Sequence, residues 1–442
     1  QRAPALPAPG LLAGQLERSL PFALTAAQRR VAAEIAGDLA QSSPMQRLLQ
    51  GDVGCGKTVV AALAACQAIE AGYQVALMAP TEILAEQHFL KLRGWLEPLA
   101  VEVLWLTGSL AGKLKRQRQQ QAATSAQLIV GTHALIQERI DFSRLGLIIV
   151  DEQHRFGVRQ RLALRRKGGN PHQLMMSATP IPRTLAMSYY ADLDVSLIDQ
   201  MPPGRTPVRT RLFSTARRAQ VVAAVRAAVA GGRQAYWVCP LIEGSEKVDL
   251  QPALDTYAAL SAELVDLRIG LVHGRLRSEE KAAVMAAFVA GEIDLLVATT
   301  VIEVGVDVAN ASLMVIEHAE RFGLAQLHQL RGRVGRGAHE SVCVLLYQPP
   351  LSASARARLK IIFEHDDGFE IARQDLRLRG PGEFVGSRQS GEPLLRHADL
   401  ESDVDLVELA QAMAVQLLRD RPQDAGRHLQ RWLGEREDLL RA

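Results

Sequence analysis

The segment GDVGCGKT at residues 51–58 constrains the fold of this chain more than any other feature. The apolar run QRLLQ precedes it and the stretch VVAALAACQAIEA follows it, an order that predicts a strand, a loop and a helix. Glycines let such a loop turn so tightly that backbone N–H groups point at phosphate oxygens. Lys57 is then expected to reach the β- and γ-phosphates of ATP, and the Thr58 hydroxyl to ligate Mg²⁺. The expected phosphate-binding residues are Gly51, Gly54, Gly56, Lys57 and Thr58.

Two acidic residues end a later apolar run, LIIVDEQH. Asp151 is expected to hold Mg²⁺, and Glu152 to orient and activate the attacking water. Acidic residues also end strands simply as turn formers, but beside a phosphate-binding loop the pair indicates nucleotide hydrolysis. His154 either links the γ-phosphate site to another part of the chain or is structural. The hydroxyls of Ser177 and Thr179, in SATP, either lie beside the same site or cap their own strand end.

A candidate site for the nucleotide base lies upstream, in PFALTAAQ. The Gln28 amide is placed to read both edges of adenine, with the Phe22 ring stacked on it. The same residues are also compatible with an ordinary helix start at Thr25, because Thr followed three residues later by Gln is a capping pattern.

Short apolar runs separated by helical stretches fall into two sets, one between residues 74 and 180 and the other between 234 and 348. Continuous apolar strands between helices predict parallel sheets covered on both faces. The segment MPPGRTPVRT at 201–210 separates the two sets and is expected to be a hinge. The expected organisation is α/β, with a linker from an upstream domain at 1–20, a first lobe at 21–205, a second lobe at 206–352 and a helical tail at 353–442.

The second lobe lacks a phosphate-binding loop but carries QLHQLRGRVGRG at 326–337. Arg333 and Arg336 are three residues apart, so on a helix they would share one face and converge on a γ-phosphate held by the first lobe. An arginine supplied in this way stabilises the transition state of hydrolysis. Arg331 points elsewhere and pairs either with DNA phosphate or with a carboxylate.

Composition narrows the class of protein. A net charge of +3 does not indicate nucleic-acid binding by itself, so any such binding depends on local patches. Four scattered cysteines without a CxxC pair predict a reduced, cytoplasmic protein with neither a zinc module nor a disulfide framework. No apolar run approaches the roughly 18 residues of a membrane span.

The ordered motifs resemble those of superfamily 2 helicases from about residue 20 to residue 340: GDVGCGKT, APTEILAEQH, GTHAL, DEQH, SAT, TTVIEVGVD and QLRGRVGR. The stretches DEQHRFGVRQRLAL, MSATPIPRTLAM, ADLDVSLIDQMPPGRTP and ERFGLAQLHQLRGRVGRG resemble the RecG family of bacterial ATP-dependent branched-DNA helicases. The tail ARQDLRLRGPGEFVGSRQSG resembles the translocation motif that this family shares with transcription-repair coupling factors.

The resemblance implies two tandem RecA-like lobes, a C-terminal helical hairpin with a translocation tail, and DNA lying across both lobes. In the tail, Arg358 and Arg379 would brace the hairpin and Gln389 would lie in a loop near the DNA. Asp307 would contact ribose, and Glu303 would form a structural ion pair. Each of the remaining expected contacts either binds DNA phosphate or caps its own loop. They are Thr81, Thr107, Ser109, His273, Thr299 and Thr300.

The expected function is that of an ATP-dependent DNA helicase or translocase acting on replication forks and Holliday junctions in recombination and repair. The family's N-terminal wedge domain has no counterpart here, so this chain is expected to be the motor portion. We expect a monomer at the bacterial nucleoid that contacts single-stranded-DNA-binding protein. The alternatives are an RNA helicase, a transcription-coupled duplex translocase and a non-catalytic scaffold that binds nucleic acid.

Overall fold

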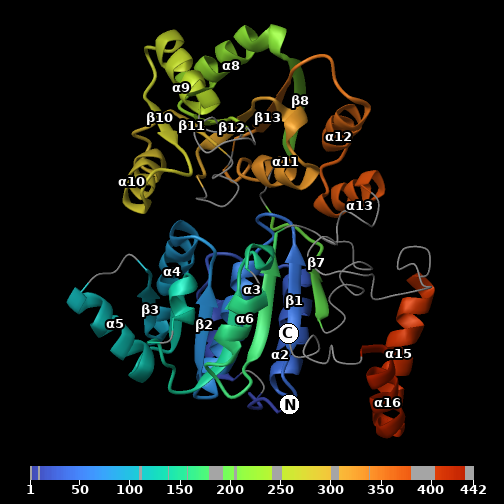
Figure 1. Ribbon diagram of the computed structural model, residues 1–442. Coiled ribbons are helices and arrows are strands. Elements are labelled where there is room, and N and C mark those ends of the chain that lie inside the picture. The colour runs from blue at the N-terminus through green and yellow to red at the C-terminus, as the bar shows by residue number, and fades with distance from the viewer. Residues whose placement is uncertain are drawn as a thin grey trace.

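The computed structural model describes residues 2–7, 10–108, 112–137, 139–156, 158–178, 193–203, 207–240, 251–299, 308–337, 339–379 and 404–433. Within them the chain forms two lobes, each built on one sheet with helices on its faces (Figure 1). Every strand pairing in both sheets is parallel. The predicted α/β class with two parallel-sheet lobes and C-terminal helices is confirmed.

The first lobe contains a seven-stranded sheet, in the order β3-β4-β2-β5-β6-β1-β7, among the residues described. Its strands are β1 (Gln46–Gly51), β2 (Gln74–Met78), β3 (Val103–Leu106), β4 (Leu128–Gly131), β5 (Leu145–Val150), β6 (His172–Ser177) and β7 (Asp194–Ile198). Its helices are α1 (Leu11–Ser19), α2 (Ala26–Leu39), α3 (Lys57–Glu70), α4 (Glu82–Leu96), α5 (Gly112–Thr124) and α6 (Val158–Arg165), with short 3₁₀ turns η1 (Glu97–Leu99), η2 (His133–Ile136) and η3 (Gln153–Arg155).

The second lobe contains a six-stranded sheet, in the order β10-β11-β9-β12-β13-β8, over the same described ranges. Its strands are β8 (Val208–Ser214), β9 (Gln234–Val238), β10 (Ile269–Val272), β11 (Leu295–Ala298), β12 (Ala311–Ile316) and β13 (Ser341–Tyr347). Its helices are α8 (Arg218–Ala230), α9 (Gln251–Glu263), α10 (Ser278–Val289) and α11 (Leu324–Arg331), with 3₁₀ turns η4 (Thr215–Arg217) and η6 (Ala319–Arg321).

The C-terminal helices are α12 (Ala353–Glu364), α13 (Gly368–Arg379), α15 (Val404–Asp420) and α16 (Pro422–Leu433). The first two pack on α11, and their buried side chains Leu359, Ile362 and Ile371 belong to the core of the second lobe. The start of the predicted tail is therefore continuous with that core, and α13 lies beside α11 on the side of the second lobe that faces the first lobe (Figure 1).

The central strands are buried along their whole length, as in β2, β4, β5 and β9. This burial explains their unbroken apolar sequence, because helices cover both faces of a parallel sheet. Strands β3, β7 and β8 lie outside the apolar runs singled out from the sequence, and all are edge strands. Edge strands are covered less completely, so β7 and β8 carry polar residues and give a weaker signal.

The hinge predicted at 201–210 is too long at its C-terminal end. Strand β8 begins at Val208 and pairs in parallel with β13, with Val208 opposite Ser341. The last residues of that segment, from Val208 onward, are therefore part of the sheet. In the part of the chain that the structure describes, no helix is both long and apolar enough to cross a membrane.

Candidate active site

A cleft of about 840 Å³ lies between the two lobes. The first lobe contributes the loop after β1, residues in the middle of α4 and the end of β5, and the second lobe contributes the segment after α11. Among its lining residues are Gly54, Gly56, Lys57, Thr58, His88, Asp151, Glu152, Arg333 and Arg336. Most residues expected to handle nucleotide phosphates are thus brought to one cavity, from positions almost three hundred residues apart.

The phosphate-binding loop, residues 51–58 (hereafter the P-loop), has the backbone that its glycines predict. Gly54 and Gly56 have φ of +83° and +92°, values that disfavour any residue with a side chain. Helix α3 begins at Lys57, directly after Gly56, so its unpaired N-terminal N–H groups face the cleft as an anion site. The Lys57 Nζ donates to the carbonyl oxygens of Gly51 and Asp52, at 2.8 and 3.1 Å.

The acidic pair follows β5 with a sharp change of backbone direction. Asp151 comes directly after the last strand residue, and Glu152 adopts the left-handed conformation, with φ +48° and ψ 55°. A non-glycine residue in that region is strained, and such strain gathers at functional sites. The two carboxylates therefore point from one tight turn, and both line the cleft.

The pKa values of the two carboxyls are shifted in opposite directions. Burial raises the pKa of the Glu152 carboxyl, and the neighbouring Asp151 charge raises it further, against the opposing charges of Lys57 and Arg333. Burial also acts to raise the pKa of Asp151, but hydrogen bonds from His88 and from the Glu152 N–H, with the Lys57 charge, hold it below its usual value. Asp151 is thus held as a carboxylate, as a ligand for a cation must be.

His88 is a residue of the site that the sequence did not indicate. Its Nε2 lies 2.7 Å from Asp151 Oδ2, in a pair that is almost wholly buried. His88 shares one face of α4 with the buried Leu84 and Leu92, at spacings of four residues. A histidine on an otherwise apolar helix face was the available signal, but only the fold shows that its partner is Asp151.

The geometric argument for Arg333 and Arg336 was wrong, although both line the cleft. Helix α11 ends at Arg331, so the two arginines do not share a helix face. They follow the helix, whose C-cap is Gly332, in a turn where Gly335 has φ +81°, a conformation that glycine adopts without steric cost. Arg336 Nε donates to the Gly332 carbonyl oxygen at 3.2 Å, a contact that holds this turn.

Arg331 pairs with a carboxylate, which is one of the two predicted alternatives. Its side chain is nearly inaccessible and lies 3.3 Å from Asp366 Oδ1. It also donates to the carbonyl oxygens of Ile362, His365 and Asp366, at 2.8, 2.9 and 3.1 Å. A guanidinium used in this way crosslinks the second lobe to the connection between α12 and α13.

The two residues expected to bind adenine do not line the cleft. Gln28 is buried, its Oε1 accepts from the Thr25 N–H, and its Nε2 donates to the Cys55 carbonyl oxygen at 2.8 Å. Thr25 completes a capping box with Gln28 at the start of α2, which was the alternative interpretation. The Phe22 ring is 43% exposed and packs edge-on against Trp95. Adenine recognition by this pair stays a prediction.

The expected DNA contacts have varied environments. Thr81 caps α4 by accepting from the Leu84 N–H, Thr107 and Thr299 are buried at strand ends, and His273 is partly exposed. Arg358 donates to the Glu320 carbonyl oxygen, which ties α12 to the second lobe. The remaining predictions lie outside the described residues, for Thr179, Ser109, Thr300, Glu303, Asp307 and Gln389, or outside the described side chains, for His154 and Arg379.

The cleft offers oxygen donors suited to Mg²⁺, which prefers one or two carboxylates together with phosphate oxygens and water. Asp151, kept ionised, and the Thr58 hydroxyl at the start of α3 are such donors. Within the described ranges, no three His, Cys, Asp or Glu side chains gather closely enough to hold a metal by themselves. The donor set therefore fits a magnesium ion that arrives with a nucleotide.

Three family models match successive parts of the chain. They are the DEAD/DEAH box helicase domain at 25–188, the helicase conserved C-terminal domain at 220–338, and the C-terminal part of RecG domain 3 at 365–430. Together with the two-lobed fold and the P-loop cleft between the lobes, these matches define the class as a protein with two tandem helicase domains.

Three curated relatives show which family within this class the chain belongs to. The chain is 56% identical over 439 residues to the ATP-dependent DNA helicase RecG of Acidithiobacillus ferridurans, covering 99% of the chain and 64% of that protein. It is 56% identical to RecG of Escherichia coli K12 and 50% identical to RecG of Bacillus subtilis, covering 96% and 91% of the chain and 62% and 59% of those proteins. The chain belongs to the RecG family, and it spans about three fifths of the length of these curated relatives.

Two solved structures also resemble this chain. A structure of RecG bound to a three-way DNA junction matches with a TM-score of 0.75 and 45% identity, covering 92% of this chain and 53% of that one. Saccharomyces cerevisiae Dbp5 bound to RNA and ADP BeF3 matches with a TM-score of 0.61 and 16% identity, covering 84% of this chain and 97% of that one. The second likeness concerns the fold alone.

Proposed function

We propose that this chain is the ATP-driven motor of a branched-DNA helicase, which hydrolyses ATP between its lobes and moves along duplex DNA. The observation that carries the proposal is the convergence of Lys57, Asp151 and Glu152 of the first lobe with Arg333 and Arg336 of the second lobe on one cleft. Nucleotide hydrolysis between two lobes requires groups from both, so lobe closure and hydrolysis become coupled.

In the proposed reaction, Lys57 leaves its P-loop carbonyl acceptors and binds the β- and γ-phosphates. Mg²⁺, held by Asp151 and Thr58, would neutralise phosphate charge. Glu152 orients and deprotonates the attacking water, a role supported by its raised pKa, since a stronger base accepts a proton more readily. Arg333 and Arg336 stabilise the charge that develops on the γ-phosphoryl group.

The proposed substrate is branched duplex DNA, which is supported by membership of the RecG family. One chain contains both the P-loop lobe and the lobe that carries Arg333 and Arg336, so we propose that it works as a monomer. A place at the bacterial nucleoid follows from the proposed DNA substrate. Contact with single-stranded-DNA-binding protein is proposed on the family resemblance alone.

The test is steady-state ATP turnover by the chain alone and with single-stranded, duplex or forked DNA. We expect strong stimulation by duplex or forked DNA and weak stimulation by RNA. Lys57→Ala, purified in parallel, is the matched control and should lose turnover, because its ammonium group is the proposed ligand of the transferred phosphate. Equal turnover by the variant would show that the activity belongs to a contaminant or to another site.

A further inference from the structure

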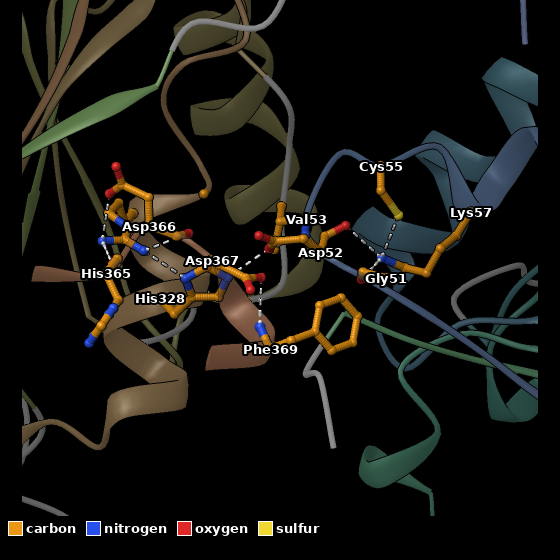
Figure 2. Close-up of polar contacts among 12 residues, drawn as sticks. Gly51, Asp52, Val53, Cys55, Lys57, His328, His365, Asp366, Asp367 and Phe369 are labelled. Carbon is orange, nitrogen blue, oxygen red and sulfur yellow. Dashed lines mark hydrogen bonds and ion pairs between the residues drawn. The ribbon is translucent and has the colours of Figure 1, made fainter. Parts of the chain in front are cut away.

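A buried contact joins the P-loop directly to the second lobe. His328 Nε2 lies 2.7 Å from Asp52 Oδ1, although the two residues are 276 positions apart. Their side chains are 6% and 18% exposed, so the contact is largely shielded from water. Figure 2 shows His328 between Asp52 on one side and the segment with His365 and Asp366 on the other. Neither residue is among those expected from the sequence to bind nucleotide or DNA.

The hydrogen-bonding partners define the tautomer of His328. Arg331 Nη2 lies 3.0 Å from His328 Nδ1, and a guanidinium can only donate. Nδ1 therefore accepts, and the ring proton sits on Nε2, which donates to the Asp52 carboxylate. The neutral His328 ring thus accepts a hydrogen bond from Arg331 at Nδ1 and donates one to Asp52 from Nε2.

On the first-lobe side, the link ends in the P-loop itself. The same Asp52 carboxylate oxygen accepts from the Val53 N–H at 2.6 Å, and the Asp52 carbonyl oxygen accepts from Lys57 Nζ at 3.1 Å. Burial acts to raise the pKa of the Asp52 carboxyl, but the hydrogen bonds from His328 and Val53 keep it below its usual value. Asp52 is therefore an ionised residue whose position depends on both lobes.

On the second-lobe side, the link ends at the C-terminus of α12. Arg331 Nη1 donates to the carbonyl oxygens of Ile362 and His365, where the chain leaves α12 for α13. A continuous series of hydrogen bonds therefore runs from Lys57 through Asp52, His328 and Arg331 to that connection. The series begins at Lys57, the side chain expected to bind phosphate, so it links the nucleotide site to the connection between α12 and α13.

Nucleotide would act on the first bond of this series. Lys57 Nζ donates to the P-loop carbonyls of Gly51 and Asp52, and a γ-phosphate is a stronger, charged acceptor for the same protons. Losing that donor would remove one of the hydrogen bonds to the Asp52 carbonyl oxygen, which also accepts from the Cys55 N–H at 3.1 Å, and so would weaken the hold on the Asp52 peptide. A cavity of about 450 Å³ borders Asp52 and His328, so the pair has space in which to separate.

We propose that His328 is a positioning residue that transmits the nucleotide state of the P-loop, through Asp52 and Arg331, to the connection between α12 and α13. The proposal rests on the proposed ATPase function. His328 itself touches no nucleotide in this scheme, because it does not line the cleft formed by the P-loop and Arg336. Its removal should therefore affect coupling between sites more than nucleotide binding.

The experiment follows backbone hydrogen exchange of the whole chain with and without the non-hydrolysable analogue AMP-PNP. In the unsubstituted chain, AMP-PNP should protect the P-loop and change exchange at residues 362–370. In His328→Ala, the P-loop should still be protected while the change at 362–370 is lost. His328→Gln, whose amide can donate to Asp52 and accept from Arg331, should restore part of it. Ala325→Ser, at an exposed position on α11, is the matched control.

Turnover gives a second readout. In His328→Ala, the ratio of DNA-stimulated to basal kcat should fall by a factor on the order of 5 to 150, with a smaller change in KM for ATP. A merely structural role predicts equal loss of basal and stimulated rates, with no rescue by glutamine. Should the alanine variant not fold, His328→Gln and the unsubstituted chain still decide the question.

Two outcomes would overturn the inference: an AMP-PNP response at 362–370 that persists in His328→Ala, or P-loop protection without any response there in the unsubstituted chain. Failure of the unsubstituted chain to bind AMP-PNP or hydrolyse ATP would instead refute the proposed function. The two failures are therefore distinguishable.

Discussion

Replacement of Arg331 by methionine tests whether this arginine has a structural role or binds DNA phosphate. Methionine keeps most of the aliphatic bulk but cannot donate to the carbonyl oxygens of Ile362, His365 and Asp366. These acceptors follow or end α12, where no helical N–H group replaces the guanidinium. The substitution should therefore loosen the α12–α13 connection.

The magnitude follows from the hydrogen bonds lost. At about 1.5 kcal/mol for each of three charge-assisted bonds, the lower end of the range for a charged donor, the connection should lose roughly 4.5 kcal/mol of local stability. If these amides exchange through local opening, their exchange should accelerate by about 10³-fold. Arg356→Met, at an exposed position of the same helix, should leave exchange unchanged.

The assay pairs hydrogen exchange at residues 359–371 with the salt dependence of DNA affinity. Each phosphate contact that is removed lowers the slope of log affinity against log salt by about one. We expect faster exchange in Arg331→Met and an unchanged slope. Unchanged exchange together with a slope reduced by one would refute the structural role and assign Arg331 to DNA.

Three further predictions concern Arg336 and Gly56 of the cleft and the buried His172 of the first lobe. Arg336→Ala should leave ATP affinity nearly intact and reduce turnover by about 10³–10⁵, because its charge acts in the transition state; an equal loss of affinity would make it a ground-state ligand. Gly56→Ala should weaken nucleotide binding, since φ is +92°, a conformation that alanine rarely adopts, and the added Cβ would displace Gln28 Nε2 from the Cys55 carbonyl oxygen; normal binding of a fluorescent ATP analogue would contradict this. His172 is buried, with Nδ1 accepting from the Met45 N–H and Nε2 donating to the Pro4 carbonyl oxygen, and burial lowers its pKa. The native state then binds fewer protons than the unfolded state, so the free energy of unfolding should fall as pH drops below about 6.5, by at most about 1.4 kcal/mol per pH unit. His172→Gln should flatten that slope in urea titrations between pH 7.5 and 5.5, and an unchanged slope would assign the acid sensitivity to other groups.

Features that depend on a few consecutive residues could be predicted from the sequence. The P-loop conformation follows from Gly54 and Gly56, which tolerate the positive φ that a tight anion-binding turn needs. The central strands were visible because burial on both faces requires unbroken apolar runs, and Asp151 followed as the residue at the end of one of them. Each of these rests on local backbone geometry or on a one-dimensional pattern of burial.

Features that depend on which elements meet required the tertiary structure. Nothing in the spacing of Arg333 and Arg336 shows that α11 ends before them, at Arg331 with Gly332 as its C-cap. Edge strands such as β8 escaped prediction because their exposed side removes the apolar signal.

The partnerships His88 with Asp151 and His328 with Asp52 join residues 63 and 276 positions apart. A histidine side chain is compatible with many partners. Only the placement of α4, which packs on β3 and β4, near the residue after β5 in one case, and of the second lobe against the P-loop in the other, selects a carboxylate as the partner. The sequence alone thus determined that two lobes exist and that one of them is built to bind phosphate. Which residues connect the two lobes was decided by long-range packing. The free energy of each such contact depends on both surfaces, so neither segment alone can indicate it.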